Sequence, residues 1–312
     1  MTILMTRRLG GALPTLALAL LLLPATATAE DFVVTNLDDS GPGSLRQAIL
    51  DGNGEADTIT FAPALAGGTV LLSSGQLVIA NDTADPDLTI DGGGDGDGTP
   101  DITIDAQGNS RVFIVANPND PNANATLQGL VITGGNEDVG GGIFNDGGTL
   151  TVTNSTISGN RADFGGGILN DGGMLAVTNS TISGNSASFG GGISHGVGGT
   201  ATVTNSTISG NSADFGGGIR SLFGTLITVA NSTISGNSAS FGGGSSPQTG
   251  PASSMKSLAR SRSRAPSSPA TRIVIAATTA PSPRWGSTSM ATGRAASPRP
   301  ATSRTSRSRT CS

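Results

Sequence analysis

The heptapeptide "NSTISGN" occurs four times, and its nearly constant spacing restricts the possible fold more than any other feature of the chain. The copies begin 25, 26 and 26 residues apart, at Asn154, Asn179, Asn205 and Asn231. A degenerate copy, "LVITGGN", begins at Leu130. A fixed period of this length indicates a solenoid, in which each repeat forms one coil and stacks on the next.

Apolar residues return to the same place in every repeat and define four columns. The columns are Ile132, Ile157, Ile182, Ile208 and Ile234; Val152, Val177, Val203 and Val229; Ile143, Ile168, Ile193 and Ile219; and Phe164, Phe189, Phe215 and Phe241. One coil cannot bury its Ile and Val side chains alone, but stacked coils turn them into continuous apolar ladders, in which each fully buried Ile, Val or Phe contributes roughly 1.5–3 kcal/mol.

The repeat has the periodicity of β-strands. In "TLTVTN" the apolar Leu150 and Val152 alternate with threonines, and "STISGN" and "GGGIFN" are short segments bounded by Gly or Asn. Three consecutive glycines in each repeat argue against a helix. The sequence therefore predicts about three strands per repeat and an all-β fold, a right-handed parallel β-helix with 25–26 residues per coil and coils about 4.8 Å apart.

The first Asn of each "NSTISGN" copy has two interpretations. Asn tolerates a left-handed backbone at bends and forms hydrogen bonds to neighbouring coils, which predicts a structural ladder of Asn154, Asn179, Asn205 and Asn231. The same residues match the N-x-S/T glycosylation pattern. We favour the structural interpretation because every copy carries the pattern as part of the repeat.

The chain divides into four predicted regions. Residues 1–29 resemble a signal peptide, with Arg7 and Arg8 before an apolar run and small residues up to Ala29, which predicts a secreted or cell-surface protein. Residues 30–66 form a cap, in which Ser44 and Gln47 make a capping box that opens a short helix. Residues 67–244 are the β-helix, and residues 245–312 are a basic, low-complexity tail.

Two segments carry a resemblance to known proteins. "VTNLDDSGPGSLRQAIL" followed by "ADTITF" resembles the N-terminal CSLREAI domain of secreted bacterial proteins, with Gly43 at the Cys position and Gln47 at the Glu position. The repeats resemble those of such proteins and of polymorphic outer membrane proteins. The resemblance covers roughly residues 31–244. It implies an exported β-helix, often attached to a cell surface, and brings no catalytic residues with it.

The regular pattern stops after Phe241, where Ser, Pro, Ala, Thr and Arg replace the next coil. Residues 30–250 hold all 22 acidic residues and four Arg, a net charge of −18, whereas residues 251–312 carry +11. The tail is either disordered or the product of a shifted reading frame. The frameshift hypothesis rests on the codons for residues 284–294. When they are read with a shifted frame across the Trp285 and Met290 codons, the result is compatible with the Gly- and Asp-rich "LGVNLDGDG". Either way, the last coil is expected to lack a cap and to expose strand edges.

A calcium site is the one candidate metal site. "DGGGDGDGTPD" places Asp91, Asp95, Asp97 and Asp101 as oxygen ligands, which Ca²⁺ prefers. The alternative is an acidic glycine loop between two coils, which we favour. No other cofactor is predicted.

Other chemical candidates have structural alternatives. Asp146 and Asp171 share a register one coil apart, as paired carboxylates of a glycosidase would, but Asp-Gly is also ordinary turn chemistry. Asp163 and Asp214 alternate with serines along a column and are not expected to touch. His195, the only histidine, replaces a bend residue. A single His excludes a multi-histidine metal site.

These patterns predict a non-catalytic, exported β-helix that acts as a structural or adhesion-type module at the cell surface or in the extracellular space. Its polar Thr, Ser and Asn faces would contact cell-surface glycans or matrix. The alternative is a carbohydrate-active enzyme, a polysaccharide lyase or hydrolase on the same fold. We predict no nucleic-acid partner, because the basic tail has no aromatic residue besides Trp285, and no transmembrane segment after removal of the signal peptide.

Overall fold

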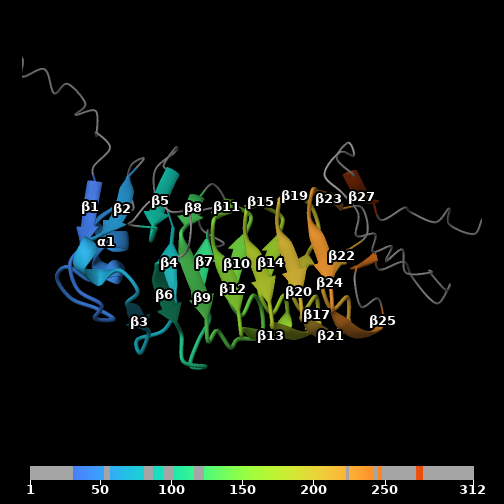
Figure 1. The fold of residues 1–312 in the computed structure, drawn as a ribbon, viewed down its shortest axis with the longest axis horizontal. Coiled ribbons are helices and arrows are strands. Elements are labelled where there is room, and N and C mark those ends of the chain that lie inside the picture. Colours follow the sequence, from blue (N-terminus) through green and yellow to red (C-terminus); the bar gives the residue numbers. More distant parts are fainter. Residues whose placement is uncertain are drawn as a thin grey trace, which may run out of the picture. The chain divides into compact units, whose positions relative to one another are not determined.

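The computed structural model describes residues 31–52, 57–80, 87–93, 101–115, 123–222, 225–241, 245–247 and 272–276. Residues up to Thr279 belong to one compact unit, and Ala280–Ser312 form a second unit outside the described residues. The predicted signal peptide and most of the predicted tail also lie outside them. The first unit is a parallel β-solenoid of about seven turns with very little helix, which confirms the predicted fold class (Figure 1).

Each coil contributes one strand to each of three long sheets. The nine-stranded sheet contains β1 (Asp31–Val34), β2 (Thr58–Phe61), β5 (Asp87–Asp91), β8 (Asn124–Gln128), β11 (Thr149–Thr153), β15 (Met174–Thr178), β19 (Thr200–Thr204), β23 (Leu226–Ala230) and β27 (Arg272–Ala276). The first seven-stranded sheet, here the β10 sheet, contains β4 (Leu77–Ile79), β7 (Phe113–Val115), β10 (Ile143–Asp146), β14 (Ile168–Asp171), β18 (Ile193–His195), β22 (Ile219–Ser221) and β26 (Ser245–Pro247). The second, here the β12 sheet, contains β3 (Thr69–Leu71), β6 (Ile102–Asp105), β9 (Leu130–Thr133), β12 (Thr156–Ser158), β16 (Thr181–Ser183), β20 (Thr207–Ser209) and β24 (Thr233–Ser235).

A fourth sheet was not predicted. It has four strands, β13 (Arg161–Phe164), β17 (Ser186–Phe189), β21 (Ser212–Phe215) and β25 (Ser238–Phe241). The expectation of three strands per coil was therefore too low for the regular repeats. The segment "SASF" follows a buried Asn and precedes the three glycines, so it has room for one more strand before the chain turns into the β10 sheet.

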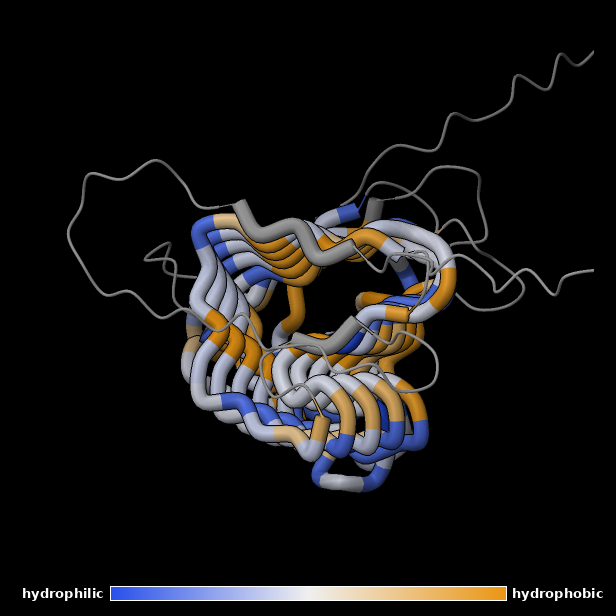
Figure 2. The backbone as a smooth tube through the Cα atoms, turned by 90° about the vertical axis from the view of Figure 1, so that its right-hand side faces the viewer, coloured by the Kyte–Doolittle hydropathy of each residue, from blue (hydrophilic) through white to orange (hydrophobic). Residues whose placement is uncertain are grey.

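Like residues of successive repeats lie in register. Val152 pairs with Val177, Val177 with Val203, and Val203 with Val229. All four are at most 2% exposed. The predicted Val and Ile columns therefore form the interior. Residues of like hydropathy line up from one coil to the next (Figure 2). Burial of each such side chain contributes roughly 1.5–3 kcal/mol.

The Phe column is different from the other three. Its rings lie on the four-stranded sheet and not in the core, and Phe164 and Phe241 are 37% and 61% exposed. The expectation that Phe is fully buried, as Ile and Val are, is wrong for this column.

The hydrogen-bonding Asn ladder is also not the predicted one. Asn154, Asn179, Asn205 and Asn231 have φ of 48–50°, which confirms their predicted left-handed backbone. The ladder itself is formed by the last Asn of each heptapeptide, which is buried: Asn160 Nδ2 donates to Asn185 Oδ1 at 3.1 Å, and Asn185 Nδ2 to Asn211 Oδ1 at 3.0 Å. These amides also donate to main-chain carbonyls of the preceding coil, so they satisfy the buried polar groups at the bend.

The three consecutive glycines have a steric explanation. Gly165 adopts φ of 68°, a conformation that costs other residues about 1–2 kcal/mol. At Gly167 an added Cβ would lie 2.6 Å from the carbonyl oxygen of Gly192 in the next coil. The coils therefore stack backbone to backbone at this turn, and no side chain fits between them.

A short helix covers the N-terminal end of the core. α1 (Leu45–Asp51) buries Leu45, Ala48 and Ile49, and a 3-10 turn, η1 (Pro63–Leu65), follows β2. The Ser44 side chain accepts from the Gln47 amide at 3.2 Å, as predicted, but the Gln47 side chain donates to Asp51 instead of completing the capping box.

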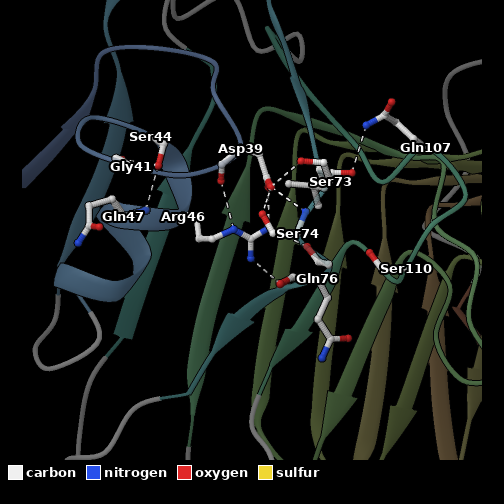
Figure 3. A network of polar contacts seen from close by, with 12 residues as sticks. Asp39, Gly41, Ser44, Arg46, Gln47, Ser73, Ser74, Gln76, Gln107 and Ser110 are labelled. Atoms are coloured by element: carbon white, nitrogen blue, oxygen red, sulfur yellow. Dashed lines mark hydrogen bonds and ion pairs between the residues drawn. The ribbon is translucent and has the colours of Figure 1, made fainter.

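An ion pair attaches this cap to the first coils (Figure 3). Arg46 Nη2 lies 2.7 Å from Asp39 Oδ1, and Arg46 also donates to the carbonyls of Gly75 and Gln76. Asp39 Oδ2 accepts from the Ser74 amide at 2.7 Å and from the side chains of both Ser73 and Ser74. Burial alone would raise the pKa of Asp39, but the hydrogen bonds from Arg46, Ser74 and Ser73 hold it well below its usual range.

The C-terminal end is covered in two of the four sheets. β26 pairs with β22 in parallel, and β27 pairs with β23 in the antiparallel direction, an exception to the parallel pairing of the other named strands. Both strands belong to the predicted tail, and each is the last strand of its sheet. In the described residues β24 and β25 each end their sheet, and their strand edges have no neighbour beyond them.

Candidate ligand-binding face

The four-stranded sheet repeats the same side chains in every coil, and we name its row of Phe rings the Phe face. Phe164, Phe189, Phe215 and Phe241 align because each strand pairs in register with the next. The strands are short and alternate small and polar residues before each Phe. The rings therefore stand at the same end of every strand, immediately before the glycine turn.

The four rings form a continuous stack. Successive centroids are 4.9, 5.2 and 4.9 Å apart, with interplanar angles of 12–13°. This spacing follows the distance between coils, and the near-parallel planes are within the range of favourable aromatic pairs. The stack therefore forms a continuous line of rings along the solenoid.

A buried arginine supports the stack from the neighbouring β10 sheet. The Arg220 guanidinium lies 4.6 Å from the centroid of Phe189 and 5.8 Å from that of Phe164, and it donates to Ser194 Oγ at 3.4 Å. Burial lowers the pKa of Arg220. Cation–π contact with a desolvated guanidinium is favourable by about 2 kcal/mol, so Arg220 holds the rings in place.

Polar side chains flank the rings. Asp163, Ser188, Asp214 and Ser240 precede the rings on the four strands. Ser188 Oγ donates to Asp163 Oδ1 at 3.4 Å across one coil. The aspartates alternate with serines, as predicted, so no two of them are adjacent along the column. The four strands thus carry a row of rings together with carboxylate and hydroxyl groups, which are groups that can hydrogen-bond to sugars.

No family model, curated protein or solved structure matches the chain. The CSLREAI-type and outer-membrane-repeat resemblances therefore stay predictions. No helix within the described ranges is long and apolar enough to cross a membrane.

The predicted carboxylate pair is in register. Asp146 of β10 pairs with Asp171 of β14. Burial raises the pKa of Asp146, the Asp171 carboxylate raises it further, and Arg111 lowers it. Asp171 Oδ1 also accepts from the Val197 amide at 3.1 Å, which supports the turn interpretation for that residue.

Arg111 is a neighbour of this pair that no pattern in the sequence predicts. It precedes the regular repeats, so no periodic position pointed to it. Its guanidinium is buried, donates to the Val139 carbonyl at 2.6 Å and to Gln76 Oε1 at 2.7 Å, and lies 5.1 Å from the Phe144 ring centroid. Most of its donors are thus engaged by the protein.

His195 lies inside the β10 sheet and not at a bend. It continues the buried column of Asn145 and Asn170, as the register predicted. Asn170 Nδ2 contacts His195 Nδ1 at 2.9 Å, whereas His195 Nε2 is buried and has no hydrogen-bond partner among the described residues. Burial lowers the pKa of His195, and the Asn170 carbonyl and Asp171 raise it less.

The predicted calcium ligands are only partly described. Asp91 Oδ1 accepts from the Gly93 amide at 3.0 Å and Oδ2 from Gln128 Nε2 at 3.1 Å. Asp101 lies at the start of the next strand, and Asp95 and Asp97 lie outside the described residues. Among the residues that the structure describes, no three His, Cys, Asp or Glu side chains form a metal-binding group.

Proposed function

We propose that this protein is an exported, non-catalytic β-helix that binds extracellular or cell-surface glycans along the Phe face. The observation that carries the proposal is the ladder of four stacked, partly exposed Phe rings on strands that also carry repeated Asp and Ser side chains. A linear polysaccharide presents the same groups at regular intervals. A column that repeats once per coil offers it several equivalent contacts, each weak alone and strong together.

The test is retention of the protein on insoluble polysaccharides. The double variant Phe189→Ala/Phe215→Ala should lose retention, because it removes the two central rings and leaves the core columns intact. Met174→Ala is the matched control, since Met174 is 55% exposed on the nine-stranded sheet, away from the Phe face. Retention of the double variant equal to that of wild type, with both proteins folded, would refute the proposal.

A carbohydrate-active enzyme is the second candidate, and one observation favours it. Asp146 and Asp171 are paired across neighbouring strands, and the pKa of Asp146 is raised, as that of a general acid in a glycosidase is. Incubation with polyuronates and neutral polysaccharides, with and without Ca²⁺, tests it. Turnover that disappears in Asp146→Asn would replace the non-catalytic proposal.

The calcium site stays a prediction. If Asp91 and Asp101 hold the ion together with Asp95 and Asp97, added Ca²⁺ should raise the melting temperature of the wild type and not of Asp91→Asn. A melting temperature that is the same in Ca²⁺ and in chelator would favour the acidic loop.

A further inference from the structure

The outward surface of the last four strands of the β12 sheet, which we name the hydroxyl face, is a two-column lattice. One column is Thr156, Thr181, Thr207 and Thr233, and the other is Ser158, Ser183, Ser209 and Ser235. Each residue pairs with its identical neighbour, without a register shift. The lattice therefore repeats about every 4.8 Å between coils and about every 6.6 Å along each strand.

The strands below this lattice are held at both ends. Before each strand, a buried serine accepts from the previous coil: Ser155 N donates to Ser180 Oγ at 3.2 Å, and Ser180 N to Ser206 Oγ at 3.1 Å. After each strand, the side chain of the buried Asn ladder accepts a hydrogen bond from the previous coil, as when Asn160 N donates to Asn185 Oδ1 at 3.0 Å. Threonine is also stiff about χ1. The backbone of each row and the χ1 angles of its threonines are thus restricted before any ligand arrives.

The chemistry of the hydroxyl face is uniform and neutral. The segment "NSTISG" that forms each row has no charged and no aromatic residue, although residues 30–250 carry a net charge of −18. Soluble globular domains contain about 25% charged residues on average. The absence of charge across four coils removes the side chains that would hold a strongly oriented hydration shell.

We infer that the hydroxyl face binds ice. The ligand that complements a neutral, rigid hydroxyl lattice is itself a neutral lattice of hydroxyl donors and acceptors, and the water molecules of ice repeat in two directions at spacings near those of the face. The threonine methyls favour ordered water beside them, and the hydroxyls bond to it. A polysaccharide is the weaker match, because this face has no ring for a sugar to contact.

The inference goes beyond the proposed glycan binding and does not depend on it, since the two surfaces belong to different sheets. Its test is the growth of single ice crystals in solutions of the full chain, scored by crystal shape and by thermal hysteresis, the gap between melting and growth temperatures. Wild type should shape the crystals and show hysteresis. Thr181→Glu/Thr207→Glu should lose both effects, and Thr181→Ser/Thr207→Ser, which keeps the hydroxyls and removes two methyls, should weaken them.

Thr178→Glu/Thr204→Glu is the matched control, because it places the same charges at half-exposed positions of the same coils on the nine-stranded sheet. It should behave as wild type, and melting curves should show that all variants are folded. Three results would overturn the inference: no effect of wild type on ice, equal loss in the control, or retention on crystalline cellulose or chitin without any effect on ice. The Phe189→Ala/Phe215→Ala variant should keep its effect on ice, which separates this failure from failure of the glycan proposal.

Discussion

At the residue scale, position within the coil decides what a polar side chain does. The first and last Asn of "NSTISGN" are only six residues apart, yet one turns the backbone and the other carries the buried ladder. Sequence alone predicted the left-handed backbone of the first Asn, because Asn favours it. It did not reveal which Asn faces inward, since that depends on where the added fourth strand begins.

Replacing Asn185 should cost far more stability than replacing Asn179. Asn185→Ala leaves the Ile157 carbonyl and the Asn160 amide buried without their partner, which we expect to cost about 2–4 kcal/mol. Asn179→Ala strains one left-handed residue at the surface, which costs about 1 kcal/mol. Urea denaturation of both variants measures the difference, and equal losses would contradict the assignment of the ladder.

The buried His195 should make stability depend on pH. Its pKa in the folded state is lowered, so the unfolded chain binds the proton more tightly, and the free energy of unfolding falls as pH drops below the unfolded value of about 6.5. Above that value the penalty is absent. His195→Asn restores the residue found at Asn145 and Asn170, and it should remove this dependence in denaturation curves recorded between neutral pH and the onset of carboxylate titration. An unchanged slope would show that His195 is not its source.

At the element scale, the regular repeats predict most of the strands, but not the fourth sheet or the contacts of the arginines. The Ile and Val columns predicted three of the four sheets in the regular coils, because strands with alternating polar and apolar residues can bury only one side. The Phe column was placed wrongly, since aromatic periodicity does not distinguish a core ladder from a ladder on an added sheet. Arg111 and the Arg220 contacts were not predictable, because they depend on which coils lie side by side.

The cap should lose its attachment in acid. The pKa of Asp39 is lowered in the folded state, so its contribution is present above the unfolded pKa of about 3.9 and is lost as pH falls through the lower folded value. Asp39→Asn should therefore reduce stability at neutral pH and flatten the dependence on pH below about 4. Asp38→Asn, at the exposed neighbouring residue, is the control. Its melting temperature below about pH 4 should follow that of wild type.

At the scale of the whole molecule, stacking turns a short motif into extended surfaces. Each coil contributes one Phe to the Phe face and one Thr and one Ser to the hydroxyl face, so contacts that are weak in one repeat are multiplied along the solenoid. The repeat period was enough to predict this architecture. It was not enough to predict a ligand, because which side chains face outward depends on how each coil is divided among the sheets.

The central claim is that identical residues of successive repeats lie directly beside one another, and disulfide formation tests it most directly. In a Cys311→Ser background, Thr156→Cys/Thr181→Cys joins a registered pair about 4.8 Å apart, within the range of a disulfide. Thr156→Cys/Ser183→Cys moves one cysteine along the strand by two residues, beyond that range. On mild oxidation, we predict an intramolecular disulfide in the first variant and none in the second. Equal oxidation of the two, or oxidation of the second alone, would contradict the stacking on which both proposed surfaces depend.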